Sequence, residues 1–180
     1  MKILAFAGST SSQSINRKLV RHSLNFFPDN DVTFLDLNDF EMPVFSVDKE
    51  KNDGYPEYAY QLLSLIETAD LIILSLAEHN GSYSTAFKNT LDWCSRINGK
   101  VFQDKPVFLM STSPGGFGGG NVMAAALSRF PKMGANILTH FSLPSFQQNF
   151  QEENGIVNEE LSSQFLLATD EVKRYFEPVA

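Results

Sequence analysis

Five short apolar runs, separated by amphipathic segments, are the feature that most restricts the fold of this chain. The runs fall at residues 2–8, 31–37, 70–77, 105–112 and 136–141. The third run, DLIILSLA, is uninterrupted, which is typical of a strand buried on both faces of a parallel sheet. Helical spacing of apolar residues follows each run, at residues 14–27, 56–68, 82–97, 119–130 and 159–176. Residues 38–55, rich in Asp, Pro and Gly, are predicted to form a loop.

Strands that alternate with helices predict an α/β protein in which helices cover both faces of a parallel sheet. Crossover connections are right-handed, which leaves few topologies, and five strands fit the order 2-1-3-4-5 better than the six-stranded dinucleotide fold. At 180 residues the chain is predicted to be a single domain, residues 1–180. Ligands bind such sheets beyond the carboxyl ends of the strands where the chain order reverses. We therefore expect a site between the loops that follow the first and third strands.

Composition excludes several classes of protein. A net charge of -7 argues against a nucleic-acid binder, whose surface carries a basic patch. No apolar run approaches the roughly 20 residues of a membrane span, and the first residues lack the pattern of a signal peptide, so we expect a cytoplasmic protein with no membrane partner. Cys94 is the only cysteine, which rules out an internal disulfide and a cysteine-cluster metal site.

The first candidate loop, GSTSSQSIN at residues 8–16, holds five hydroxyl side chains and two amides between a strand and a helix. The free N–H groups and partial positive charge of a helix N-terminus suit a phosphate, and hydroxyl groups add donors. The alternative is that Ser14 only caps the helix and the other hydroxyls are solvated. Neither G-x-G-x-x-G after the first strand nor G-x-x-x-x-G-K-[ST] occurs, which leaves a flat cofactor with one terminal phosphate.

Two further loops follow the third and fourth strands. The first of them, EHNGSY, covers residues 78–83, and the second, STSPGGFGGG, covers residues 111–120. Five glycines in six positions of the second loop remove side chains where a planar ligand would meet the backbone. The alternative is a flexible connector, since glycine-rich segments commonly serve as linkers.

Together, the segments GSTSSQSINRKL, EHNGSYSTAFKNTLDW and STSPGGFGG resemble the three signature loops of the NAD(P)H-dependent FMN reductase family, over roughly residues 1–140. The resemblance implies a flavodoxin-like three-layer sandwich with bound FMN. It places the FMN phosphate at Ser9, Ser11, Ser14, Ile15 and Asn16. It places the isoalloxazine across Glu78, His79, Asn80, Gly81, Ser82 and Tyr83, and across Ser113, Pro114, Gly115 and Gly116.

The resemblance also implies an activity. NADPH or NADH would reduce the bound FMN, which would pass electrons to free flavin, a quinone or a similar small acceptor. Because the redox chemistry belongs to the cofactor, no side-chain acid or base is required and we assign no catalytic residue. The family implies a homodimer or homotetramer. Two alternatives remain open at this point: a flavodoxin-type carrier of single electrons, and a flavin-free domain that binds a partner.

This chain departs from the family pattern at several positions. Ser11 stands where relatives often have arginine, which predicts a phosphate cradle of neutral donors unless Arg17 supplies the charge. His79 stands where tyrosine is common, and it would lie near the flavin or be an exposed loop residue. Trp93 and Cys94 share helical spacing with apolar neighbours and are predicted to pack in the core.

Overall fold

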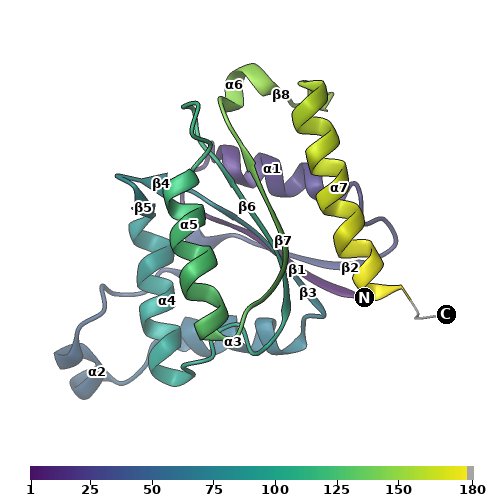
Figure 1. Ribbon diagram of the computed structural model, residues 1–180. Helices are drawn as coiled ribbons and strands as arrows, with labels where there is room; N and C mark the ends of the chain where they lie inside the picture. The colour runs from purple at the N-terminus through teal and green to yellow at the C-terminus, as the bar shows by residue number, and fades with distance from the viewer. Residues whose placement is uncertain (178–180) are drawn as a thin grey trace.

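A five-stranded parallel sheet forms the middle of the molecule (Figure 1). In this computed structural model, which describes residues 1–177, its strands are β1 (Lys2–Gly8), β2 (Asp31–Leu35), β3 (Leu71–Leu76), β6 (Pro106–Thr112) and β7 (Asn136–Leu143). The order is β2-β1-β3-β6-β7, and every neighbouring pair is parallel. Because β6 and β7 are the fourth and fifth strands of this sheet along the chain, the predicted order 2-1-3-4-5 is confirmed.

Helices cover both faces of the sheet, so the molecule has three layers (Figure 1). One face carries α1 (Ile15–Leu24) and α7 (Glu159–Phe176), and the other carries α3 (Glu57–Thr68), α4 (Thr85–Ile97) and α5 (Gly120–Arg129). Alternate residues of a strand point to opposite faces. In β3, Leu71 and Ile73 accordingly join the core beneath α1 and α7, whereas Ile72 and Leu74 join the core beneath the other three helices. The uninterrupted apolar run is thereby explained, since both faces of β3 are buried.

The segment after β2 is more ordered than the loop predicted for residues 38–55. It contains the 3-10 helix η1 (Leu37–Phe40) and the helix α2 (Val47–Asp53), which extends away from the sheet (Figure 1). Ser46 caps α2 by accepting a hydrogen bond from the N–H of Lys49. Trp93 donates its indole N–H to the carbonyl of Pro43 at 2.7 Å, which fixes the segment against α4. The loop prediction was wrong there because each helix is short and depends on local caps.

The segment after β3 also differs from the prediction, which started a helix at residue 82. It forms an antiparallel hairpin of β4 (Glu78–His79) and β5 (Ser82–Tyr83), and α4 begins only at Thr85. Asn80 and Gly81 both have positive φ, 51° and 75°. An Asn-Gly pair with two positive φ angles closes a two-residue hairpin turn whose twist matches that of the strands.

Between β7 and α7 the chain adds the short helix α6 (Phe146–Asn149) and a hairpin of β8 (Phe150–Gln151) and β9 (Gly155–Ile156). This hairpin packs against α1, where the ring of Phe150 meets the ring of His22 edge-on at 5.6 Å. The 3-10 helix η2 (Phe130–Met133) connects α5 to β7. The C-terminal half of α1 is therefore held by a part of the chain that is distant in sequence.

Trp93 and Cys94 lie in the core, as predicted. Burial raises the pKa of the Cys94 thiol to about 12, so this group stays protonated and unreactive. Within residues 1–177, no helix is both long and apolar enough to cross a membrane. The same residues include no group of three or more His, Cys, Asp or Glu side chains placed to hold a metal ion.

Candidate functional site

The loops that follow β1, β3 and β6 meet at the carboxyl edge of the sheet, because these three strands are direct neighbours. Hydrogen bonds join the loops to one another. Ser84, which caps α4, donates its hydroxyl to the carbonyl of Gly8 at the end of β1 over 2.8 Å. This bond joins the loop after β1 to the start of the helix that follows the loop after β3. Ser84 was missed as a site-building residue, although a serine just before a helical pattern is a helix-start signal.

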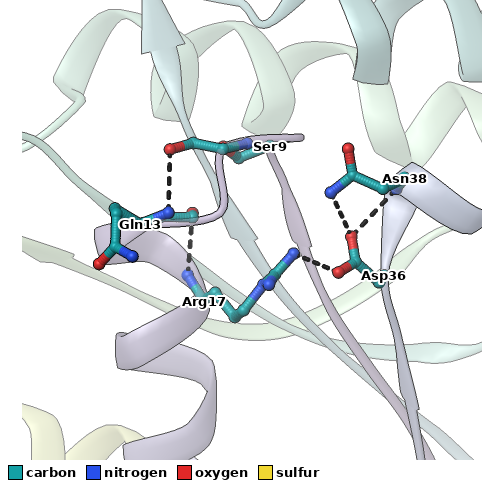
Figure 2. Close-up of polar contacts among 7 residues, drawn as sticks. Ser9, Gln13, Arg17, Asp36 and Asn38 are labelled. Carbon is teal, nitrogen blue, oxygen red and sulfur yellow. Dashed lines mark hydrogen bonds and ion pairs between the residues drawn. The ribbon is translucent and has the colours of Figure 1, made fainter.

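In the first loop, three serine hydroxyls accept hydrogen bonds from backbone N–H groups. Ser9 accepts from Ser11 N at 3.2 Å, and Ser11 accepts from Gln13 N at 3.2 Å. Ser14 caps α1 by accepting from Arg17 N at 3.2 Å, and Figure 2 shows the bonds that end at Gln13 N and Arg17 N. A hydroxyl that accepts still carries its own proton. The loop is thus held in shape while three O–H donors remain available.

The start of α1 adds unpaired backbone donors. Among residues 1–177, no acceptor pairs with the N–H of Ile15 or of Asn16, the first two residues of the helix. No acidic side chain lies in the first turn of α1. Free N–H groups and the positive end of the helix dipole attract an anion when no carboxylate already occupies the position. The N-terminus of α1 is therefore a suitable place for a phosphate.

Asn16 has a different role from its neighbours, because its side chain is buried and bonded inside the protein. Its carbonyl oxygen accepts from the Ser75 hydroxyl at 2.7 Å and from Thr112 N at 3.1 Å. Its amide nitrogen donates to the carbonyl of Thr112 at 3.2 Å. The Asn16 side chain therefore ties α1 to β3 and β6, and only its backbone N–H is left to face a ligand.

Arg17, the possible source of positive charge for the cradle, is paired with Asp36 at the end of β2 (Figure 2). The same carboxylate accepts from the backbone and side-chain nitrogens of Asn38 at 3.0 and 2.8 Å. Burial would raise the pKa of Asp36, but the Asn38 hydrogen bonds and the nearby Arg17 charge outweigh it and lower that pKa. Asp36 therefore stays ionised and holds the Arg17 guanidinium at the end of β2.

Glu78 lies in the second loop with its carboxylate directed at the start of α5. One oxygen accepts from the Asn121 side chain at 3.0 Å and the other from the N–H of Val122 at 3.0 Å. Burial would raise the pKa of Glu78, but these hydrogen bonds outweigh it and lower that pKa. Glu78 thereby places a negative charge at the N-terminus of α5. It also fixes the loop after β3 to this helix, which follows the loop after β6.

The rest of the β4–β5 hairpin divides into an exposed tip and an inward-facing end. His79, Asn80, Gly81 and Ser82 are exposed. The ring of Tyr83 is directed inward and stacks on Phe130, with ring centroids 5.8 Å apart and planes 11° apart. Burial raises the pKa of Tyr83, and its hydroxyl is the one buried side-chain oxygen or nitrogen without a partner among residues 1–177. Tyr83 therefore anchors the hairpin, and the exposed tip is left to contact a ligand.

In the third loop, Gly115 and Gly116 face open space. A β-carbon on Gly115 would meet no heavy atom within 4 Å, and one on Gly116 would meet only the Ser145 hydroxyl at 3.9 Å. Ser113 donates to the carbonyl of Gly115 at 3.2 Å, and Ser145 N donates to the same carbonyl at 2.9 Å. The fold itself therefore does not require glycine at these two positions, although the backbone around them is firmly held.

Gly118 and Gly119 differ from that pair, since their backbones have φ of 62° and 80°. A β-carbon on Gly118 would lie 3.0 Å from Pro144 N, and one on Gly119 would lie 3.0 Å from the β-carbon of Ser111. Both positions require glycine for folding. Ser145, which follows β7, holds this loop through the hydrogen bond from its N–H to the Gly115 carbonyl. The sequence analysis did not find Ser145, because its partner lies 30 residues earlier and no local pattern indicates the contact.

Comparison with known proteins shows which family the chain belongs to. The family model described as NADPH-dependent FMN reductase matches residues 1–148. The chain belongs to the NADPH-dependent FMN reductase family. An NADPH:quinone oxidoreductase of Arabidopsis thaliana is 30% identical to this reductase over 171 residues, which cover 88% of this chain and 83% of the relative. An NAD(P)H:quinone oxidoreductase of Solanum tuberosum is 28% identical over 179 residues, covering 93% and 88%.

The fold of the reductase also matches solved structures. A flavoenzyme NAD(P)H:(acceptor) oxidoreductase from Paracoccus denitrificans superposes with a TM-score of 0.72 at 22% identity, covering 96% of this chain and 97% of that one. The likeness confirms the flavodoxin-like sandwich implied by the loop motifs. Family membership makes the protein an enzyme that uses FMN and takes electrons from NAD(P)H. It does not favour the single-electron carrier or the flavin-free domain.

The residues at the carboxyl edge fit FMN. The start of α1 offers free N–H groups and hydroxyl protons to a phosphate, and the two open glycines leave space where a flat ring can approach the backbone. The groups that could bind FMN are neutral, since Arg17 and Glu78 are both engaged within the protein. Bound FMN supplies the redox chemistry, and the protein orients it.

Proposed function

We propose that this reductase binds FMN with its phosphate at the start of α1 and its isoalloxazine between the hairpin tip and the front of the glycine-rich loop. The phosphate would accept from the hydroxyls of Ser9, Ser11 and Ser14 and from the N–H groups of Ile15 and Asn16. The open N-terminus of α1 is the observation that carries this placement, because its donors have no partner within the described residues and no acid lies beside them.

The isoalloxazine would lie against residues 78–83 and residues 113–116. Gly115 and Gly116 support this position, since the space beside them is empty and their backbone is held by Ser113 and Ser145. Of the hairpin, residues 79–82 are the exposed part that can touch the ring, and Glu78 and Tyr83 hold the hairpin in place. Backbone N–H groups in such loops stabilise the negative charge that a reduced flavin carries.

The electron acceptor is proposed to be a quinone or free flavin. The plant relatives are named quinone oxidoreductases, and the family description names FMN reduction, which supports both acceptors. No residue of the site is required to transfer a proton as an acid or base, so no catalytic side chain is proposed. The chain would act as a single FMN-binding domain, residues 1–180.

A homodimer or homotetramer is part of the proposal. Val44 and Val47, on the segment that carries α2, are 72% and 52% exposed, and we propose them as part of the contact between subunits. Light scattering on the purified protein tests this directly. A cytoplasmic location stays a prediction from the sequence.

Cofactor exchange tests the proposed function. The protein is stripped of flavin and titrated with FMN, FAD and riboflavin, and NAD(P)H oxidation is then followed with a quinone or with free FMN. We expect one FMN per chain, weaker binding of FAD and riboflavin, and NAD(P)H oxidation that depends on bound FMN. Failure to take up FMN at high concentration, or a preference for FAD, would overturn the proposal.

A further inference from the structure

The helix α1 carries an unusual concentration of positive charge. Its sequence, INRKLVRHSL, contains Arg17, Lys18 and Arg21 and no acidic residue, in a chain whose net charge is -7. Burial lowers the pKa of His22, so this imidazole is neutral at physiological pH and the helix charge rests on the other three. A helix with three cations and no acid attracts anions along its side as well as at its start.

A hollow of about 490 Å³ runs along the outer side of α1. Ser12 and Ser14 line the end of the hollow at the N-terminus of α1, and Arg21 and Asn25 line the end at its C-terminus. Phe150 and Glu152, from the β8–β9 hairpin, form the opposite wall. Arg21 lies seven residues after Ser14, which is about 10 Å along a helix. The hollow therefore extends from the proposed FMN phosphate to a separate cation.

The three cations of α1 differ in how freely they could bind an anion. Arg17 is held by Asp36, and Lys18 pairs with Glu152, whose side chain is 72% exposed. The Arg21 guanidinium lies 4.4 Å above the ring of Phe34 and forms no ion pair with any of residues 1–177. A guanidinium stacked on an aromatic face keeps the N–H groups of its edge free, and that edge suits a phosphate.

We propose that this hollow binds the 2′-phosphate of an NADP-type electron donor, with Arg21 as its main ligand and Lys18 as a second. The proposal rests on the proposed function, because it assumes a donor that reaches across the FMN site. The FMN phosphate would occupy the start of α1, so a second phosphate needs cations of its own. Lys18 and Arg21, further along α1, line the hollow and provide them. Lys18 would exchange its exposed partner Glu152 for the phosphate. The site therefore favours NADPH over NADH.

Ligand binding and kinetics on Arg21→Gln test the site. Protein supplied with FMN is titrated by calorimetry with 2′,5′-ADP and with 5′-AMP, which differ only in the 2′-phosphate. One charged hydrogen bond is worth about tenfold in affinity, so wild type should bind 2′,5′-ADP about tenfold more tightly than 5′-AMP, and Arg21→Gln should lose that difference. In Arg21→Gln, the KM for NADPH should rise about tenfold, while kcat and the KM for NADH stay unchanged.

Arg96→Gln is the matched control, because Arg96 lies in the last turn of α4, away from the hollow, and pairs with Glu50. It should bind both nucleotides as wild type does. Equal binding of 2′,5′-ADP and 5′-AMP by wild type would overturn the proposal, as would unchanged discrimination in Arg21→Gln. The FMN affinity of Arg21→Gln should equal that of wild type, so a loss of FMN binding would also contradict a separate site. Repeating the calorimetric comparison on flavin-free protein gives a result even if the proposed FMN site fails.

Discussion

The N-termini of α1 and α5 lie at the same edge of the sheet, but only that of α5 is capped by a negatively charged side chain of the protein. Both helices follow central strands, β1 and β6, and both direct towards that edge N–H groups that have no partner within the helix. At α5 the protein supplies its own anion, since Glu78 accepts from Val122 N and from Asn121. At α1 only the neutral hydroxyl of Ser14 caps the helix, and no acid lies in the first turn. This difference supports the proposal that the anion at the start of α1 is the phosphate of bound FMN.

Closing the open N-terminus should have the largest effect. Ser14→Asp keeps a good cap but places a carboxylate where the FMN phosphate would bind. Two like charges about 4 Å apart cost about 4 kcal/mol near a protein surface, so FMN affinity should fall at least about 100-fold while riboflavin affinity stays the same. Ser14→Asn is the control, because it caps equally well without charge. Equal FMN affinity in the two variants would contradict the placement of the phosphate.

The glycine-rich loop allows a second comparison, between glycines that we expect to contact a ligand and glycines that the fold requires. Gly115→Val and Gly116→Val should weaken FMN and riboflavin alike, by about tenfold or more, since a side chain fills the space of the ring. Their Tm should stay within about 2 °C of wild type. Gly119→Ala should lose about 1–3 kcal/mol of stability, because φ is 80° there. Thermal denaturation and flavin titration separate the two classes, and wild-type flavin affinity in the valine variants would refute the ring position.

Adding a cation beside the N-terminus of α1 should strengthen the binding of FMN. Ser11→Arg places a guanidinium beside the loop, where only neutral donors exist now. A charged hydrogen bond contributes roughly 1.5–3 kcal/mol against about 1 for a neutral one, so FMN affinity should rise about tenfold. Riboflavin, which has no phosphate, should bind as before. An equal gain for both ligands would show that the arginine acts on the ring or on the fold instead.

Removing the anion from the closed N-terminus should give a smaller effect, on stability. Glu78→Gln loses a carboxylate near a helix start, which contributes about 1 kcal/mol. The folded-state pKa of Glu78 is depressed, so this contribution is fully present above the pKa of the unfolded chain and is lost as the pH falls through the folded-state pKa. Denaturant unfolding at pH 7 and below pH 4 measures it. A difference between wild type and variant that grows on acidification would contradict the role of Glu78.

The smallest effect is expected for Arg17→Ala. Because its guanidinium is held by Asp36, removing it should change the preference for FMN over riboflavin by no more than about twofold. Titration of both flavins measures this preference. Loss of most of the preference would mean that Arg17 supplies the phosphate charge and that the cradle is not neutral.

The sequence predicted the sheet because the central strands have a strong local signal. The runs at β1, β3 and β6 are apolar on both faces, and the helices between them leave only a few topologies. The hairpin before α4 was missed because the predicted helix began at residue 82 and so included Ser82 and Tyr83, although the Asn80-Gly81 pair just before them favours a two-residue hairpin turn. The helix α2 was missed because it is short and buries none of its residues.

The three loops of the site were predicted, but the role of each residue within them was not. Asn16 ties α1 to strands whose residues lie 59 and 96 positions away. Glu78 accepts a hydrogen bond from α5, 44 positions away, and Asp36, just after β2, forms an ion pair with Arg17 of α1. Contacts of this kind depend on how the elements pack, and no local pattern in one sequence encodes them. They decide which donors remain free for a ligand.

The most direct measurement of the central claim is the amide resonance of Ile15 and Asn16 in isotopically labelled protein. Flavin-free protein is titrated with FMN and, in parallel, with riboflavin, which differs only in lacking the phosphate. The account predicts that both amide protons shift downfield with FMN, because they donate to the phosphate, and that riboflavin leaves them unchanged while shifting Gly115 and Gly116 as FMN does. Identical responses of Ile15 and Asn16 to the two flavins would contradict it.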